Sequence, residues 1–222
     1  MTIDVNPEQR KYAAATLRNR QPILEVLQEV LPPRGTVLEI ASGTGEHSIY
    51  FAPNLQPRKW LPSEPNPVMR LSIEAWRSHS PSPNLYPVID LNVCDRPWPI
   101  EGEGTTQEQF DFSTDPITAI VNINMIHISP WEACLGLMAG AGRILPPKGI
   151  LYLYGPYKRD GQHTASSNQE FDRSLRSRHP EWGVRDIEAV IAAARVENLT
   201  FLKTVEMPAN NLSVIFQREL NH

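Results

Sequence analysis

The segment Thr36-Val-Leu-Glu-Ile-Ala-Ser-Gly-Thr-Gly-Glu-His47 decides the fold expected for this chain of 222 residues. Residues 36–40 form a short apolar run that predicts a buried strand, and a helix is expected from about Gly45. Gly43 and Gly45 lie at the turn between them, where glycine reaches positive φ at low cost and lets the main chain approach a ligand closely. A strand that passes through such a turn into a helix predicts a nucleotide-type binding site.

Strands and helices alternate on both sides of this segment. The last two expected strands are joined by a turn too short for a parallel crossover, so they should be antiparallel. This order predicts an α/β, doubly wound, Rossmann-like fold with a seven-stranded, mainly parallel sheet and an antiparallel last strand. Strands are expected at 36–40, 59–64, 85–93, 117–124, 149–154, 200–206 and 212–216, and helices at 21–31, 67–78, 133–145 and 183–197 besides the one from about Gly45.

Length and composition suit a single domain. We expect one domain over residues 1–222, with an N-terminal helical cap at 1–33 and an α/β core at 34–222. The acidic stretch 101–108 is expected to be a local surface insertion. Hydrophobic residues make up 41% of the chain and charged residues 21%, an ordinary balance for a globular domain.

Charge, cysteine usage and the N-terminal sequence exclude several classes of partner. The formal net charge is −4, which argues against broad nucleic-acid binding because a surface that follows phosphates needs clustered Lys and Arg. The two cysteines form no C-x-x-C pair, so no metal site is expected. Neither a signal peptide nor a membrane-spanning apolar run is recognisable, so we expect a cytoplasmic protein without a membrane partner. The oligomeric state is left open.

The register of the glycines distinguishes two cofactor classes. A dinucleotide site of the form G-x-G-x-x-G would need glycines at 41, 43 and 46, but the chain has Ala41, Gly43 and Glu46. The pattern acid-x-G-x-G-x-G fits at Glu39, Gly43 and Gly45, and departs only at Ala41 by one methyl group. It resembles motif I of the class I S-adenosylmethionine-dependent methyltransferases, in which the acid orients the loop and the charged methionine end of the cofactor. The resemblance implies S-adenosylmethionine as cofactor and S-adenosylhomocysteine as product.

Further cofactor contacts follow from the same resemblance. Glu64 ends the second expected strand, where a carboxylate can accept both ribose hydroxyls; the alternative is that it only caps the following turn. By analogy Asn92 should border the adenine. Asn124 could bind the cofactor carboxylate or the substrate, or simply end its strand, and Arg20 could fold over that carboxylate. The expected cofactor-binding set is Glu39, Ala41, Ser42, Gly43, Gly45, Glu64, Asn92, Asn124 and Arg20.

Motifs outside the loop are similar to one narrower family. It is a set of methyltransferase-like proteins, bacterial to animal, catalogued as a domain of unknown function. The similarity runs from about Tyr12 to Arg218 and implies a fold and a cofactor, but no substrate. The motifs include Asn124-Met-Ile-His-Ile-Ser-Pro-Trp131, Tyr154-Gly-Pro-Tyr157, Trp182-Gly-Val-Arg-Asp186 and Met207-Pro-Ala-Asn-Asn211.

Two residues are candidates for catalysis. Methyl transfer from a sulfonium is an in-line displacement, and a general base helps only when the acceptor atom carries a proton. His127 could be that base, with a pKa near neutrality, or a buried histidine bonded to the backbone. Tyr157 could offer a hydroxyl and an aromatic wall to the acceptor, or merely pack. Four arginines could recognise an anionic substrate or form a solvated helical face, namely Arg173, Arg176, Arg178 and Arg185.

The sequence therefore predicts an S-adenosylmethionine-dependent methyltransferase with a small-molecule substrate and an unknown acceptor. The alternative is a non-catalytic module that binds S-adenosylmethionine or S-adenosylhomocysteine and supports a partner protein. A nicotinamide-dependent oxidoreductase is disfavoured by the glycine register.

Overall fold

The computed structural model describes residues 7–101 and 110–220, so the expected insertion at 101–108 lies almost entirely outside the described residues. The chain divides into two compact units. The first comprises Met1–Asn92 and Pro97–Val121, and the second comprises Val93–Arg96 and Asn122–His222.

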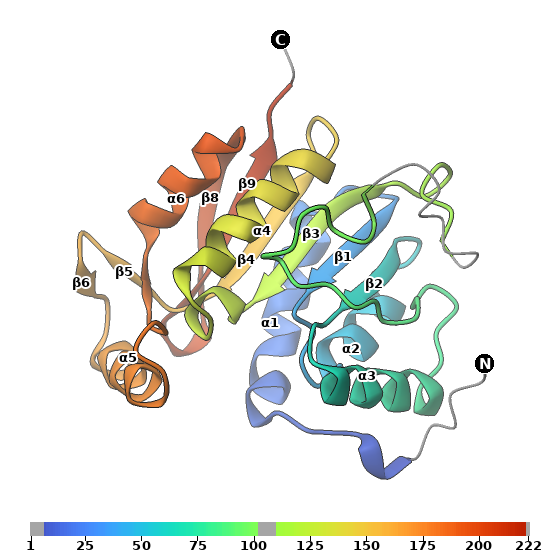
Figure 1. Cartoon of the computed structure of the whole chain (residues 1–222), viewed down its shortest axis with the longest axis horizontal. Helices are drawn as coiled ribbons and strands as arrows, with labels where there is room; N and C mark the ends of the chain where they lie inside the picture. Colours follow the sequence, from blue (N-terminus) through green and yellow to red (C-terminus); the bar gives the residue numbers. More distant parts are fainter. Residues whose placement is uncertain (1–6, 102–109, 221–222) are drawn as a thin grey trace. The chain divides into compact units, whose positions relative to one another are not determined.

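The first unit contains the segment that decided the fold. β1 (Thr36–Ile40) is buried along its whole length and pairs in parallel with β2, with Thr36 opposite Lys59. Burial of every residue, Glu39 included, is typical of a strand covered on both faces. The unit's other elements are η1 (Pro7–Gln9), α1 (Ala14–Val30), α2 (Glu46–Asn54), β2 (Lys59–Ser63), α3 (Pro67–His79) and most of β3 (Ile117–Ile123) (Figure 1).

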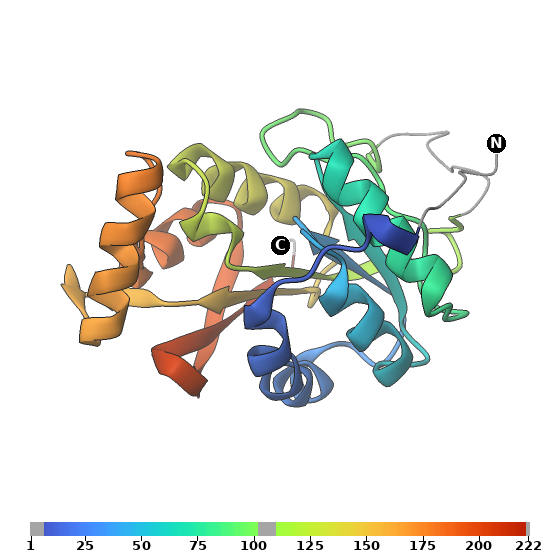
Figure 2. The same cartoon turned by 90° about the horizontal axis from the view of Figure 1, so that it is seen from below.

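An N-terminal segment of this unit is held against α3. Figure 2 shows η1, in dark blue, beside that helix. The backbone N–H of Lys11 donates to Ser72 Oγ at 2.8 Å, and the indole N–H of Trp76 donates to the Lys11 carbonyl at 3.0 Å. The segment that precedes α1 is therefore tied to the helix that follows β2.

The second unit is built on three antiparallel strands. β4 (Ile150–Gly155) pairs with β9 (Asn211–Arg218), which in turn pairs with β8 (Leu199–Met207), both antiparallel. The remaining elements are η2 (Met125–His127), α4 (Trp131–Ile144), β5 (Tyr157–Arg159), β6 (Gln162–His163), α5 (Ser166–Arg178), β7 (Arg185–Asp186), α6 (Ile187–Val196) and η3 (Pro208–Asn210) (Figure 1).

Hydrogen bonds order six strands as β2-β1-β3-β4-β9-β8, and a separate small sheet has the order β6-β5-β7. The α/β class and the antiparallel last strand are confirmed, but the expected count of seven strands in the main sheet is wrong. The segment 85–93 makes only two isolated bridges, Trp60 with Leu85 and Ser63 with Ile89. Tyr86 and Ile89 donate to the Trp60 and Pro62 carbonyls of β2, but the Val88 N–H between them donates to the Glu74 carboxylate at 2.9 Å, so a regular ladder does not form.

Two helices begin well away from the residue expected. α1 starts at Ala14, so Pro22 lies inside the helix and not in its first turn. The added turns bury the polar residues Thr16 and Asn19, which an apolar periodicity does not reveal. α6 starts only at Ile187, because the Asp186 side chain accepts the Glu188 N–H as an N-cap and residues 183–186 do not join the helix. Within residues 7–101 and 110–220, no helix has the length and apolar character to cross a membrane.

Candidate functional site

The loop that follows β1 turns by alternating backbone conformations. Ala41, Gly43 and Gly45 have positive φ values of 55°, 56° and 91°. The N–H of Ser42 donates to the Ser63 carbonyl at 2.9 Å, which ties the loop to the end of β2, and the Gly45 N–H donates to the Ser42 carbonyl at 3.1 Å. Ala41 thus adopts the same left-handed conformation as Gly43 and Gly45, although it carries a methyl group.

Gly45 has a steric requirement that Gly43 lacks. A Cβ added at Gly45 would lie 2.9 Å from both the Cα and the Cγ1 of Ile73 on α3, whereas one added at Gly43 would meet nothing within 4 Å. The loop therefore packs closely on α3 at one glycine and leaves open space beside the other.

This difference predicts unequal costs for two matched substitutions. Gly45→Ala should lower the free energy of unfolding by about 2 kcal/mol, because a left-handed conformation costs a non-glycine residue roughly 1 kcal/mol and the contact with Ile73 adds to it. Gly43→Ala should cost only the conformational part, about 1 kcal/mol. Urea unfolding of both variants measures the difference. Equal losses would contradict the close packing at Gly45.

The Glu39 carboxylate lies beneath the loop and joins three elements. It is buried on β1 and accepts hydrogen bonds from the Ser48 hydroxyl of α2 and, at 2.8 Å, from the Trp60 indole N–H of β2. Burial raises the pKa of Glu39 to about 7, although the bonds from Ser48 and Trp60 act in the opposite direction. Glu39 therefore fastens β1 to the two elements that frame the loop.

The Glu64 side chain reaches the loop itself. One carboxylate oxygen accepts the Gly43 N–H at 2.9 Å and the other accepts the Asn66 N–H at 3.0 Å. Burial raises the pKa of Glu64, while the backbone bonds from Asn66 and Gly43 and the charge of Arg70 oppose that rise. The bond from Asn66 is the turn cap that the sequence offered as the alternative role of Glu64. It is present together with the direct bond from Gly43 of the loop. Each oxygen keeps a further lone pair for a ligand.

Arg20 lies beside the helix that follows the loop. Its guanidinium is stacked 4.5 Å from the ring centroid of Tyr50 on α2, and the neighbouring Asn19 side chain bonds His47 Nε2 at 2.9 Å. Burial, with a contribution from Arg20, lowers the pKa of His47 to about 4. Asn92 is exposed at the end of the segment whose Ile89 carbonyl accepts the Glu64 N–H at 3.0 Å.

Two further side chains that support the loop were not predicted. The Glu46 carboxylate accepts the Thr44 hydroxyl at 3.0 Å and the Ala13 N–H, and the Ser72 hydroxyl donates to the Thr44 carbonyl at 2.8 Å. An acid in the first turn of a helix is common on dipole grounds alone, so the sequence does not single out Glu46.

In the second unit, His127 is fully buried on η2 and bonded to backbone. Its Nδ1 accepts the Arg185 N–H at 3.4 Å, its carbonyl accepts the Gly183 N–H at 2.9 Å, and its own N–H donates to the Asn124 carbonyl at 3.0 Å. Burial, and then the charge of Arg185, lower the pKa of His127 to about 3. The pKa is therefore far below the near-neutral value expected from the sequence.

Asn124 and Tyr157 lie next to this histidine. The Tyr157 ring is fully buried and meets the imidazole edge-on, with ring centroids 5.0 Å apart. A Cβ added at Gly155 would lie 2.4 Å from His127 Nε2 and 3.1 Å from Asn124 Oδ1. Within the described residues, neither His127 Nε2 nor the Tyr157 hydroxyl has a hydrogen-bond partner. The structure therefore brings together Asn124 and both catalytic candidates.

Three of the four arginines are engaged within this unit. Arg185 donates to backbone carbonyls and lies 5.6 Å from the centroid of Trp131. Arg176 bonds Asp172, and Arg178 lies 5.9 Å from the centroid of Trp182. Arg173 is exposed.

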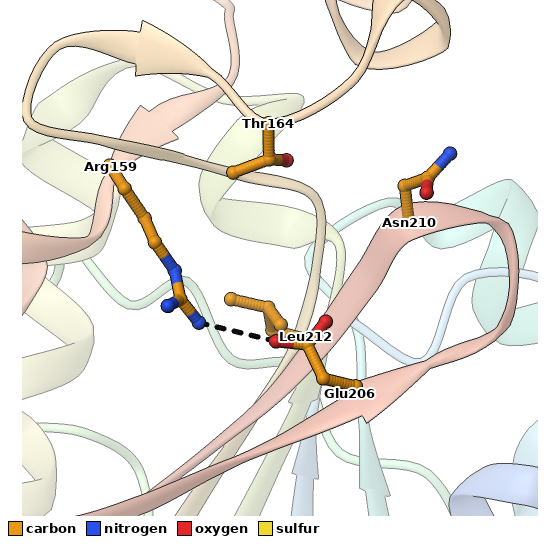
Figure 3. A pocket seen from close by; sticks show the side chains of 5 residues that line it. All are labelled: Arg159, Thr164, Glu206, Asn210 and Leu212. Atoms are coloured by element: carbon orange, nitrogen blue, oxygen red, sulfur yellow. Dashed lines mark hydrogen bonds and ion pairs between the residues drawn. The ribbon is translucent and has the colours of Figure 1, made fainter.

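A pocket of about 240 Å³ opens in the second unit (Figure 3). Arg159 forms an exposed ion pair with Glu206 at 3.3 Å, and Leu212 pairs across the sheet with Gly155. Neither Arg159 nor Glu206 was predicted, because single exposed charges in adjoining hairpins carry no sequence signal. The lining residues are Arg159, Thr164, Glu206, Asn210 and Leu212. The part of the chain that the structure describes holds no group of three or more His, Cys, Asp or Glu arranged for a metal ion.

The fold is shared with solved methyltransferase structures. An O-methyltransferase family protein from Burkholderia thailandensis matches 94% of this chain with a TM-score of 0.70 at 15% identity. Human N-acetylserotonin methyltransferase, solved in complex with S-adenosylmethionine, matches 90% with a TM-score of 0.66 at 10% identity. This chain spans only 58% and 55% of those two proteins.

A third structure is similar over nearly its own full length. It is a sarcosine dimethylglycine methyltransferase candidate from Galdieria sulphuraria, of which this chain covers 94%, with 97% of this chain matched, a TM-score of 0.67 and 14% identity. Identities this low show a common fold and no more.

A family model gives a closer relationship. The model described as a protein of unknown function, DUF938, matches residues 10–218, which is nearly the whole chain. The motifs that suggested a methyltransferase-like family of unknown function lie within those residues. The chain belongs to the DUF938 family.

Proposed function

We propose that this protein is an S-adenosylmethionine-dependent methyltransferase that acts on a small molecule. The observation that carries the proposal is the loop of alternating positive φ at residues 41, 43 and 45, with the Gly43 N–H bonded to the acid that follows β2. The methyltransferase names of the structures with the same fold support the reaction class.

The residues of the loop fit the adenosyl end of this cofactor. Open space lies beside Gly43, and the Glu64 oxygens have lone pairs left after their backbone bonds, so the carboxylate can accept two ribose hydroxyls. Glu39 would keep the loop in place, and Arg20 would attract the cofactor carboxylate. When bound, the cofactor would supply a methyl group on a sulfonium.

His127 and Tyr157 remain the candidates for contacting the methyl acceptor. Both have a buried polar atom without a partner among the described residues, and such atoms carry a free-energy cost that a ligand can relieve. The acceptor itself is a small molecule in this proposal, and no nucleic-acid or membrane partner is invoked.

Thermal unfolding with three ligands tests the cofactor class. S-adenosylmethionine or S-adenosylhomocysteine at about 100 times its Kd should stabilise the protein by roughly 2.7 kcal/mol, and NADH should not. Stabilisation by NADH alone would contradict the proposal. Labelled S-adenosylmethionine incubated with a metabolite extract should then yield a labelled small product. Tight cofactor binding without any transfer would favour the non-catalytic binding module.

A further inference from the structure

The pocket of the second unit lies between two hairpins. β5 and β6 form one hairpin, which carries Arg159, and β8 and β9 form the other, which carries Glu206 and Leu212. Thr164 follows the first hairpin, and Asn210 lies at the tip of the second. These five residues line the cavity of about 240 Å³. The cavity is therefore formed within one unit of the fold, by segments that lie far apart in the sequence.

Opposite charges face each other at this pocket. Figure 3 shows the Arg159 and Glu206 side chains extending toward one another from the two hairpins, with Arg159 Nη2 3.3 Å from Glu206 Oε1. The two side chains keep 47% and 80% of their surface exposed. One hydrogen bond joins them, not the two parallel bonds that a guanidinium and a carboxylate can form. An exposed pair of this kind is weakly held, so a ligand can separate its members at little cost.

Leu212 gives the pocket an apolar side. Glu206 on β8 and Leu212 on β9 are paired residues in the antiparallel register, so their side chains lie on the same face of the sheet. Leu212 is buried, whereas Glu206 is exposed. The pocket therefore combines charged side chains that water reaches with an apolar side chain that lies deeper.

A buried amide fixes the other two lining residues. Asn168, in the first turn of α5, is buried, and its Nδ2 donates to Thr164 Oγ1 at 3.1 Å and to the Asn210 carbonyl at 2.9 Å. The Asn210 side chain in turn donates to Ser167 Oγ at 3.1 Å. Thr164 and Asn210 are thus held in place before any ligand binds, which reduces the entropy that binding must overcome.

The turn that carries Asn210 has an unusual backbone. Ala209 and Asn210 are successive non-glycine residues with positive φ values of 57° and 59°. This left-handed conformation is unfavourable for residues other than glycine and persists only where neighbouring contacts hold it. Asn168 and Ser167 supply such contacts. The strained turn therefore keeps Asn210 at the edge of the pocket.

The charges of the pocket select a ligand that carries both signs. A purely anionic ligand would bind Arg159 but be repelled by Glu206, and a purely cationic ligand would meet the reverse. A ligand with a carboxylate and an ammonium group can replace the internal pair on both sides, because the carboxylate accepts two guanidinium bonds and the ammonium donates to the glutamate. The cavity is smaller than the roughly 300–1,000 Å³ of sites for drug-sized ligands, so the ligand must be small.

We propose that this pocket is a binding site for a small amino acid with an apolar side chain, whose carboxylate binds Arg159 and whose ammonium group binds Glu206. The apolar side chain contacts Leu212, and the fixed residues Thr164 and Asn210 form the remaining walls. The proposal concerns binding and does not depend on methyl transfer, so it can be tested separately from the proposed function.

Saturation-transfer NMR of the full chain with L-alanine, L-valine and L-leucine at millimolar concentration tests the site. At least one of them should bind. Two truncated probes then isolate each charge: the amide of that amino acid has no carboxylate, and the corresponding carboxylic acid has no amine. Each should bind more weakly than the amino acid by about tenfold or more. Absence of binding by all of the amino acids, or equal binding of the amino acid and its truncated forms, would overturn the proposal.

Two exposed substitutions assign the charges. Arg159→Gln and Glu206→Gln should each weaken binding of the amino acid by about tenfold or more. Arg159→Gln should not weaken binding of the amide, and Glu206→Gln should not weaken binding of the carboxylic acid, because each of these probes uses only the charge that remains. Arg173→Gln and Glu170→Gln, exposed changes on α5 outside the pocket lining, are the matched controls and should bind as the wild type does.

The unfolding temperature separates binding from a structural role of the ion pair. An exposed pair contributes little stability, so Arg159→Gln and Glu206→Gln should unfold within about 3 °C of the wild type when no ligand is present. A loss of stability in both variants with unchanged affinity for the amino acid would show that the pair only joins the two hairpins, and would overturn the proposal. If the wild type binds the amino acid but transfers no methyl group to any acceptor, the proposed function fails and the binding site stands.

Discussion

Glu39→Gln should be more stable than the wild type above pH 7, by about 3 kcal/mol, and should lose much of the wild type's pH dependence below it. The unfolded chain ionises Glu39 near the ordinary glutamate pKa of 4.5, whereas burial in the folded chain raises that pKa to about 7. As the pH rises between these values the unfolded state loses the proton first, so the free energy of unfolding falls by about 1.36 kcal/mol per pH unit and then levels off. A glutamine cannot ionise, and its carbonyl oxygen can still accept from Ser48 and Trp60.

Urea unfolding at pH 5 and pH 8 measures this effect as a difference between the two proteins. Glu25→Gln, on the exposed face of α1, is the matched control and should follow the wild type at both pH values. An equal fall in stability for wild type and Glu39→Gln would show that Glu39 is ionised in the folded state at pH 5. If the charge also serves the cofactor, the stabilised variant should bind S-adenosylhomocysteine more weakly, an exchange of function for stability.

Glu64→Ala should weaken S-adenosylhomocysteine binding by a hundredfold or more, which is at least about 2.7 kcal/mol. Two losses add up: the hydrogen bonds that the carboxylate would accept from the ribose, each worth about 1.5–3 kcal/mol because the acceptor is charged, and the bond that holds the Gly43 N–H in place. Isothermal titration calorimetry with S-adenosylhomocysteine measures the affinity. Binding should also weaken as the pH falls through the raised pKa of Glu64, since the protonated acid is a poorer acceptor.

The control for this substitution is Glu25→Ala, which removes a carboxylate from the exposed face of α1 and should change the affinity less than threefold. Glu64→Gln should fall between the two, because its amide keeps one oxygen while its NH₂ faces a backbone N–H. An unchanged affinity in Glu64→Ala would mean that the acid only caps the turn at Asn66.

The parts of the fold that were predicted correctly are those that neighbouring residues determine. β1, β2 and β3 match the expected strands to within a residue, and β3 is the near-continuous apolar run that is typical of a strand buried on both faces. The antiparallel β8–β9 pair followed from a short connection. The segment 85–93 has the composition of a strand, but the Val88 N–H donates to Glu74 on α3 instead of to β2, and only isolated bridges form. Apolar content alone does not detect such a side-chain contact.

The same distinction applies to the candidate site: features set by neighbouring residues could be predicted, and contacts between residues far apart in the sequence could not. The glycine spacing indicated the loop and its acids, since backbone freedom and a nearby carboxylate are local properties. The contacts around His127 were not predictable, because the sequence separates the histidine from Arg185 by 58 positions and no periodic pattern relates them. The low pKa of His127 has the same origin: it depends on burial and on a distant arginine, and neither can be read from the residue itself.

Ala41 has a consequence for recognising related chains. A pattern search that requires glycine at positions 41, 43 and 45 rejects this protein, although its backbone is left-handed at all three. Neighbouring bonds, such as Ser42 to Ser63, hold the turn firmly enough for one methyl group to be tolerated there. The feature to compare between distant relatives is therefore the sequence of backbone conformations along the loop, and a profile that scores φ instead of residue letters would retain members that a glycine count discards.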